Sequence, residues 1–136
     1  MRHQEKADGR VLAIVERGYR GALEKQFFDE LYLATELHRQ LGGLDVLLRG
    51  QAVTYALDAP PVPPLRIGNR TVDTLTDPRQ GLRTLLEAGV GVWAEEPDLA
   101  ALGAAGSPDR LLAGIRIARE GETASRWTDY RMVCFL

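Results

Sequence analysis

The stretch from Leu44 to Leu57, LDVLLRGQAVTYAL, decides the fold of this chain. Its first part, 45–48, is short and apolar without polar alternation, which is typical of a strand covered on both faces in a parallel sheet. The turn 49–51 interrupts that pattern, and 52–56 is the start of a short helix. In α/β folds, a buried strand that ends in a Gly-containing polar turn and enters a helix is where ligands bind. The stretch predicts an α/β fold and a binding position, without identifying the ligand.

The segment before this stretch predicts a strand, a loop and a long helix. The apolar run 11–15 is the strand, and 16–21 is the loop. From about Ala22 to Leu41 we expect the helix, whose apolar face has a 3.6-residue period and is made by Phe27, Leu31, Ala34, His38 and Leu41. Since His38 lies on or beside this stripe, we interpret it as a packed residue rather than a catalytic one. With 45–48 this segment forms one βαβ unit.

The segment after this stretch predicts a connector, a hairpin and further α/β elements. Residues 59–64 read as a stiff polyproline-like connector, and Gly68-Asn69 as the turn of a hairpin outside the main sheet. We expect strands at 90–94, 114–118 and 130–136, a helix that starts at Asp77-Pro78, and shorter helical pieces at 97–102 and 120–127. Ser107-Pro108 can cap one further helical turn. The prediction is a three-layer α/β/α sandwich with a mainly parallel sheet of about five strands.

Composition excludes several classes of protein. The 136 residues suit a single domain at 10–136 behind a polar, flexible tail at 1–9, in which His3 faces solvent. The net charge of −2 gives no field for nucleic acid. No apolar run of about 18 residues predicts a membrane span, and the first residues lack the features of a signal peptide, so a cytoplasmic location is expected. The single cysteine, Cys134, excludes an internal disulfide and a multi-cysteine metal site. No motif indicates a metal or a cofactor, so we expect neither.

The carboxyl ends of the predicted strands carry the candidate site residues. In the loop 16–21 two glycines, Arg17 and Arg20 precede a helix N-terminus, which favours an anion. The GxxG spacing matches neither the dinucleotide nor the Walker pattern, and a tight turn is the favoured interpretation. Glu95 and Glu96 follow another strand, where a solvated turn is favoured over acid–base catalysis. If a pocket exists at this edge, we expect Arg17, Tyr19, Arg20, Gln51 and Glu95 to frame it as ligand-binding residues, with Glu95 as the catalytic candidate.

Three residues outside this edge have simpler interpretations. Cys134 lies in the apolar run 131–136, where a thiol is usually a small buried hydrophobe with a raised pKa. Trp93 and Trp127 are expected in the core or at an interface rather than as a cofactor platform.

Four segments together resemble the DsrE/DsrF/DsrH-like family, which includes the TusB, TusC and TusD sulfur-relay subunits and the YchN-like proteins. The segments are VLAIVERGYRG, DVLLRGQAV, LLEAGVGVWAEEPDLAALG and AGIRIAREGETASRWTDYRMVCFL, in the family's order and over about three-quarters of the chain. The resemblance implies a three-layer sandwich that assembles into trimers or hexamers, alone or with paralogous subunits. Active members carry a persulfide on a cysteine whose position, aligned on 89–94, is held here by Glu95.

Three functions follow as expectations. The first is a non-catalytic DsrE-like subunit or accessory protein that acts in an oligomer in sulfur-related metabolism, because a carboxylate cannot carry transferable sulfur. The second is a protein or enzyme that binds a small anionic ligand around Glu95. The third is a persulfide carrier that uses Cys134.

Overall fold

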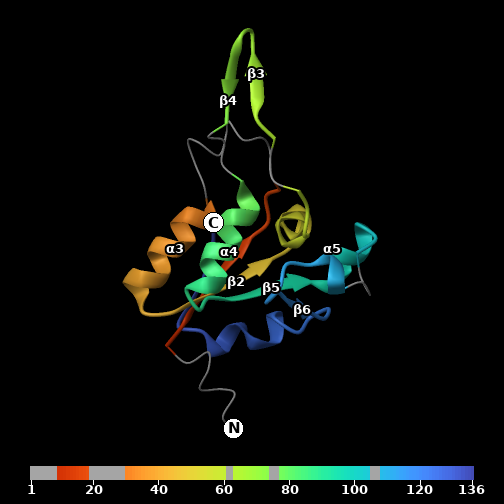
Figure 1. Ribbon diagram of the computed structural model, residues 1–136. Coiled ribbons are helices and arrows are strands. Elements are labelled where there is room, and N and C mark those ends of the chain that lie inside the picture. Colours follow the sequence, from red (N-terminus) through yellow and green to blue (C-terminus); the bar gives the residue numbers. More distant parts are fainter. Residues whose placement is uncertain (1–8, 19–29, 61–62, 74–76, 105–107) are drawn as a thin grey trace.

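A parallel five-stranded sheet forms the centre of the fold (Figure 1). The computed structural model describes residues 9–18, 30–60, 63–73, 77–104 and 108–136. Its elements are β1 (Val11–Val15), α3 (Glu30–Leu41), β2 (Leu44–Leu48), η1 (Gly50–Ala56), β3 (Leu65–Ile67), β4 (Arg70–Val72), α4 (Pro78–Glu87), β5 (Gly91–Glu95), α5 (Glu96–Ala101), η2 (Pro108–Arg110), β6 (Arg116–Ala118), η3 (Ala124–Asp129) and β7 (Met132–Phe135), where η marks a 3-10 helix.

The strand order β6-β5-β2-β1-β7 puts β2 in the middle of the sheet. Every residue of β2 is buried, as its apolar, non-alternating sequence predicts. All four pairs of neighbouring strands are parallel. Leu48 lies opposite Val15 on β1 and Ala94 on β5, so the carboxyl ends of three strands meet at one edge. The predicted α/β sandwich with a mainly parallel sheet is confirmed.

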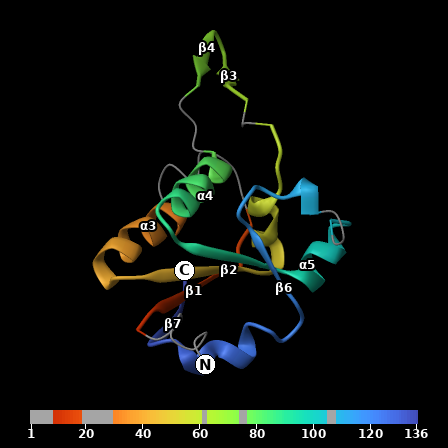
Figure 2. The same ribbon diagram turned by 60° about the horizontal axis from the view of Figure 1, so that its bottom comes forward.

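The two faces of the sheet are covered unequally. Figure 2 shows α3 and α4 on one side of the sheet and the C-terminal η3 segment on the other. The larger apolar cluster holds alternate residues of β1, namely Val11, Ala13 and Val15, together with Leu31 of α3 and Leu82 and Leu85 of α4. The smaller cluster consists of Leu12, Ile14, Leu47, Trp93 and Ala118, with Trp127, Tyr130 and Val133 packed against it. The η3 face therefore has the thinner cover.

Several elements are shorter than predicted. The helix expected over 22–41 is described from Glu30 onward, and 22–29 lie outside the described residues. The strand expected over 114–118 begins at Arg116, and the last strand spans Met132–Phe135. The helical piece expected from Glu120 is a turn followed by η3, because Gly121 has a φ of +80°, which a continuous α-helix does not accommodate.

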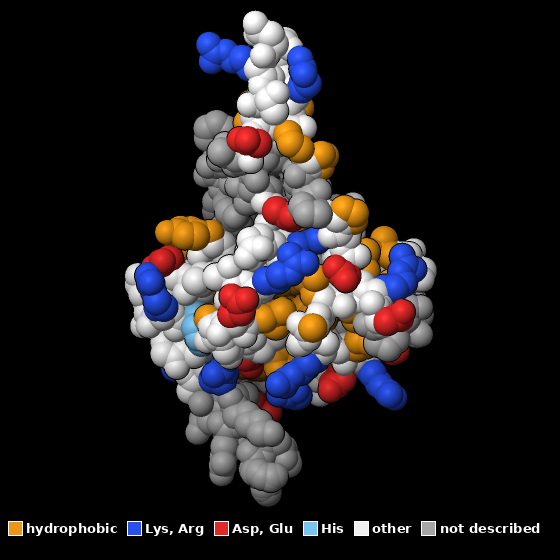
Figure 3. Space-filling view, viewed as in Figure 1, with side chains coloured by type: hydrophobic (Ala, Val, Ile, Leu, Met, Phe, Trp, Pro, Cys, Tyr) orange, Lys and Arg blue, Asp and Glu red, His pale blue; other side chains and the backbone are white. Residues whose placement is uncertain are grey.

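The predicted hairpin is confirmed and projects from the body of the fold. β3 and β4 pair antiparallel around Gly68-Asn69 and form a two-stranded sheet of their own. Figure 3 shows this arm with basic side chains near its tip, and Arg66 and Arg70 belong to its strands. Ile67 is 57% exposed. A lone two-stranded hairpin is marginally stable in water, so contacts beyond its own strands would stabilise it.

Local polar contacts fix the ends of α3 and α4. The N–H of Arg79 donates to Asp77 Oδ1 at 3.0 Å, which confirms the predicted N-cap. His38 Nδ1 accepts from the N–H of Leu44 at 3.1 Å, so its other ring nitrogen carries the proton and donates to the carbonyl of Ala88 at 3.2 Å. His38 therefore links the ends of α3 and α4 to the start of β2, as a packed histidine does.

Among the described residues, no helix combines the length and hydrophobicity needed to span a bilayer.

Candidate functional site

The loops after β1 and β2 touch at the carboxyl edge of the sheet. A Cβ added to Gly18 would lie 2.9 Å from Cβ of Gln51, so only glycine permits this approach. Arg17 in the loop after β1 and Gln51 at the start of η1, both predicted site residues, are exposed and lie on these neighbouring segments. Tyr19 and Arg20, which the sequence also predicts here, lie outside the described residues.

Glu95, the third described candidate, ends β5 and faces a different loop. Its Oε2 accepts a hydrogen bond from the buried Thr123 hydroxyl at 3.3 Å. Within the described part of the chain, no hydrogen bond or ion pair joins Glu95 to Arg17 or Gln51. The structure thus brings two of the predicted residues onto adjacent loops and places Glu95 at the same edge with its carboxylate hydrogen-bonded.

Other charged groups at this edge hold the loops together. Arg49 Nε lies 3.3 Å from Glu16 Oε2, and the N–H of Gly50 donates to Asp98 Oδ2 at 2.8 Å. The backbone donor that opens η1 is therefore already satisfied by a carboxylate. Internal pairs hold these loops together, and Arg17 is an exposed cation beside them.

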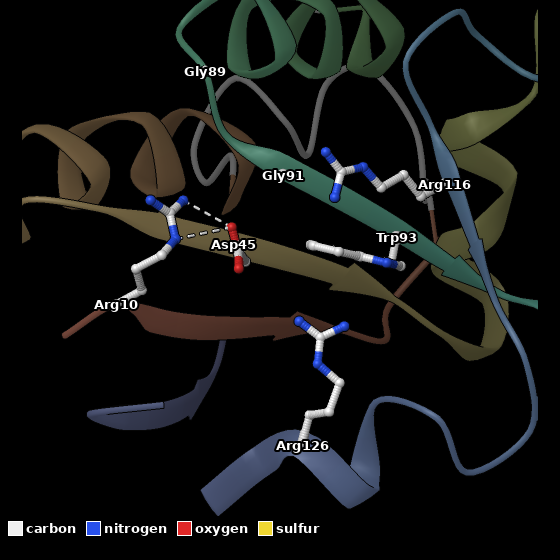
Figure 4. A pocket seen from close by; sticks show the side chains of 7 residues that line it. All are labelled: Arg10, Asp45, Gly89, Gly91, Trp93, Arg116 and Arg126. Atoms are coloured by element: carbon white, nitrogen blue, oxygen red, sulfur yellow. Dashed lines mark hydrogen bonds and ion pairs between the residues drawn. The ribbon is translucent and has the colours of Figure 1, made fainter. Parts of the chain in front are cut away.

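A cavity of about 350 Å³ lies elsewhere, beside Trp93 on the η3 face (Figure 4). Residues from well-separated parts of the chain line it: Arg10, Asp45, Gly89, Gly91, Trp93, Arg116 and Arg126. Sequence reasoning did not single it out as a site. Asp45, Gly91, Trp93 and Arg116 lie on one face of the sheet, but that becomes visible only once β2, β5 and β6 are in register.

Asp45 forms the polar floor of this cavity and is 6% exposed. Its Oδ1 accepts from Arg10 Nε at 3.2 Å and from Arg10 Nη2 at 2.7 Å, and its Oδ2 accepts from the Tyr130 hydroxyl at 2.8 Å. Burial, and next the hydrogen bond to Asp45, raise the pKa of Tyr130 well above its usual range. The sequence does contain one signal for this cavity, because a carboxylate in an apolar buried strand requires a partner.

Trp93 is the aromatic wall of the cavity, and two guanidinium groups lie against it. The Cζ atoms of Arg116 and Arg126 are 4.9 and 5.6 Å from the centroid of the indole ring. Figure 4 shows these two groups on opposite sides of the ring. Gly91 makes room for the indole, because a Cβ there would lie 2.8 Å from Trp93 Cζ3 and 2.9 Å from Asp45 Oδ1.

Cys134 lies away from both regions. It is on the edge strand β7, opposite Ala13, half-buried against the larger apolar cluster. Burial raises the pKa of its thiol, which favours the unreactive protonated form. Among the described residues, no group of histidine, cysteine and acidic side chains could hold a metal ion.

Comparison with solved structures identifies the fold. The chain is similar to the YchN protein of E. coli, at a TM-score of 0.69 and 21% identity, over 93% of this chain and 98% of that one. A second similar structure is MTH1491 of Methanobacterium thermoautotrophicum, a protein of unknown function, at a TM-score of 0.63 and 17% identity over 93% and 99% of the two chains. BT1422 of Bacteroides thetaiotaomicron, also of unknown function, has a TM-score of 0.57 and 14% identity over 91% and 93%. No family model and no curated protein matches the sequence.

Proposed function

We propose that this chain, which has a DsrE/YchN-like fold, is a non-catalytic subunit or accessory protein that acts in a cytoplasmic oligomer in sulfur-related metabolism. One observation carries the proposal. At the end of β5, where the family resemblance expects a persulfide cysteine, the chain has Glu95, whose carboxylate is bound to Thr123.

Sulfur relay has chemical requirements that Glu95 does not meet. A relay residue needs a thiolate that attacks a sulfur and later leaves. The chain's one thiol, Cys134, is on β7, three strands across the sheet from β5, which is roughly 14 Å at the usual strand spacing. Its raised pKa also disfavours the thiolate. These features support a role in assembly rather than in transfer.

The β7 edge supplies a surface suited to assembly. Among the described strands, β7 is the last in the sheet and pairs on one side with β1, and such an edge can pair with another chain. Two large apolar side chains of this strand, Met132 and Phe135, are 43% and 59% exposed. Further copies of this chain, or paralogous subunits, could cover them, in line with the trimers and hexamers that the resemblance implies.

The native mass, measured by light scattering after size exclusion, tests this proposal. We expect a trimer or hexamer, or a heteromer when paralogous subunits are present. Met132→Ser should weaken the assembly, whereas Leu102→Ser removes an equally exposed apolar side chain (45%) at the end of α5 and should not. A strict monomer that captures no partner from its native lysate would contradict the proposal.

A small anionic ligand at the carboxyl edge is the second candidate function. The contact of Gly18 with Gln51 favours it, because that contact brings the exposed Arg17 and Gln51 onto neighbouring loops. Glu95 would then act as an anchor or base. Arg17→Ala and Glu95→Gln should each reduce a ligand-induced melting shift or an activity. If neither variant changes either quantity, this alternative fails.

A further inference from the structure

The cavity beside Trp93 is separate from the carboxyl-edge residues, since Arg17, Gln51 and Glu95 do not line it. It lies between the sheet and η3, on the face with the thinner cover. An inference about it therefore does not depend on the role of Glu95 or on the state of assembly.

The cavity has an excess of positive charge. The charges of Arg10 and Asp45 cancel, because their ion pair has a 2.7 Å contact and both oxygens of Asp45 are already hydrogen-bonded. Arg116 and Arg126 then remain. In the part of the chain that the structure describes, neither of these two guanidinium groups has an ion pair or a hydrogen bond, and each contacts the Trp93 ring. Two uncompensated cations thus line one cavity of a chain whose net charge is −2.

The indole ring lies between these two cations, and both of them line the cavity. Both guanidinium carbons lie within 5.6 Å of one ring centroid, on opposite sides of the ring. The negative faces of the ring offset part of the repulsion between them. A guanidinium that rests on an aromatic face keeps N–H donors for other acceptors, and its fork matches the oxygens of a phosphate or carboxylate.

Charge and volume together define the class of ligand. Two unpaired arginines favour a dianion, and a tetrahedral phosphate presents several acceptor oxygens around one centre to both forks. A volume of about 350 Å³ lies in the range of small-molecule sites and leaves room for an organic group next to the phosphate. We propose that this cavity binds a small organic phosphomonoester, with its phosphate held by Arg116 and Arg126 beside Trp93.

Isothermal titration calorimetry on the full chain tests the proposal, with phenyl phosphate as the probe at about pH 8, where a phosphomonoester carries two charges. Succinate tests whether any dianion suffices, and acetate provides a monoanion. We expect binding of phenyl phosphate that is at least about tenfold tighter than binding of either carboxylate. Arg116→Gln and Arg126→Gln should each weaken it by about tenfold or more, because each removes one charged fork.

Arg119→Gln is the matched control. Arg119 is an exposed arginine directly after β6, three residues from Arg116, and it does not line the cavity. The same change of net charge there should leave the affinity within about twofold. Arg116→Lys keeps the charge and loses the fork, so it should bind less tightly than the unsubstituted chain and more tightly than Arg116→Gln.

Three results would overturn the proposal. The first is no heat of binding at about 10 mM phenyl phosphate, which corresponds to an affinity too weak for a built site. The second is succinate or acetate binding as tightly as phenyl phosphate. The third is equal affinity in the Arg116→Gln and Arg119→Gln variants. Circular dichroism and the melting temperature show whether each variant is folded, and Arg126→Gln supplies an independent substitution if Arg116→Gln is not.

Discussion

Arg10 Nη2 lies 2.7 Å from Oδ1 of Asp45, so a cation just ahead of β1 compensates a carboxylate that is buried in the central strand β2. Arg10→Ala would leave Asp45 with the Tyr130 hydroxyl as its remaining side-chain donor. Breaking a buried pair costs about 3–5 kcal/mol, and since 26% of the Arg10 side chain is exposed to solvent, we expect a loss of about 2–3 kcal/mol. Urea unfolding measures it.

Arg39→Ala is the control for this experiment. Arg39 pairs with Glu36 on the surface of α3, with 67% of its side chain exposed, and removing it should change the free energy of unfolding by at most about 0.5 kcal/mol. Equal losses in the two variants would show that the Arg10–Asp45 pair has no special role in stability.

Tyr130 predicts a loss of stability at alkaline pH. Burial and the hydrogen bond to Asp45 raise its pKa in the folded chain, whereas the unfolded chain releases the proton near the ordinary value of 10.0. The stabilisation is therefore complete below that value and is lost as the pH rises above it. Tyr130→Phe should flatten this dependence and cost about 1–2 kcal/mol near neutral pH through the lost hydrogen bond.

Urea midpoints over about pH 7 to 11 test this prediction, and both chains should carry Cys134→Ala because the pKa of that thiol is raised too. If the variant with Phe at position 130 loses stability at alkaline pH as steeply as the chain with Tyr130, another group causes the loss.

Substitution of Gly91 and of Gly81 by alanine should have opposite effects on the stability of the fold. A Cβ at Gly91 would lie 2.8 Å from Trp93 Cζ3, so Gly91→Ala should displace the indole and destabilise the fold by about 1–3 kcal/mol. Gly81 lies inside α4, where a Cβ would meet Leu31 at an ordinary 3.4 Å. Gly81→Ala should therefore stabilise the helix by about 0.5–1 kcal/mol. Thermal unfolding of both variants checks the signs, and a stable Gly91→Ala variant would contradict the packing described around Trp93.

We expect the thiol of Cys134 to react slowly with labelling reagents in the folded chain. It is half-buried on β7 and its pKa is raised by burial, so labelling with a disulfide reagent near neutral pH should be at least about tenfold slower than in urea. A persulfide carrier would instead label rapidly when folded. Equal rates with and without urea would support the alternative in which Cys134 transfers sulfur.

How well the sequence predicted the fold varied with the range of the interactions. The central strand, the cap at Asp77, the hairpin at Gly68-Asn69 and the packed His38 were predicted because the pattern or turn chemistry of neighbouring residues specifies each of them. The short β6 was predicted two residues too long. Gly114 has a φ of +96°, but the sequence alone does not show which glycine adopts a turn conformation.

The candidate sites also differ in whether neighbouring residues or distant contacts specify them. Arg17, Gln51 and Glu95 were predicted as site residues because α/β folds bind ligands at the carboxyl ends of strands, and the structure places these three positions at that edge. Asp45 was seen only as part of an apolar strand. Arg10, Arg116 and Arg126 did not stand out among the other arginines of the chain.

The sequence by itself determined the class of fold, the buried central strand and the absence of a cysteine at the end of β5, because these depend on local pattern and residue identity. Only the tertiary structure decided that Asp45 is paired with Arg10 and that Arg116 and Arg126 meet at Trp93. These contacts depend on strand order and register, which are set by packing between segments far apart in the chain. A shift of one residue in register would turn the side chains of Asp45, Trp93 and Arg116 to the opposite face of the sheet.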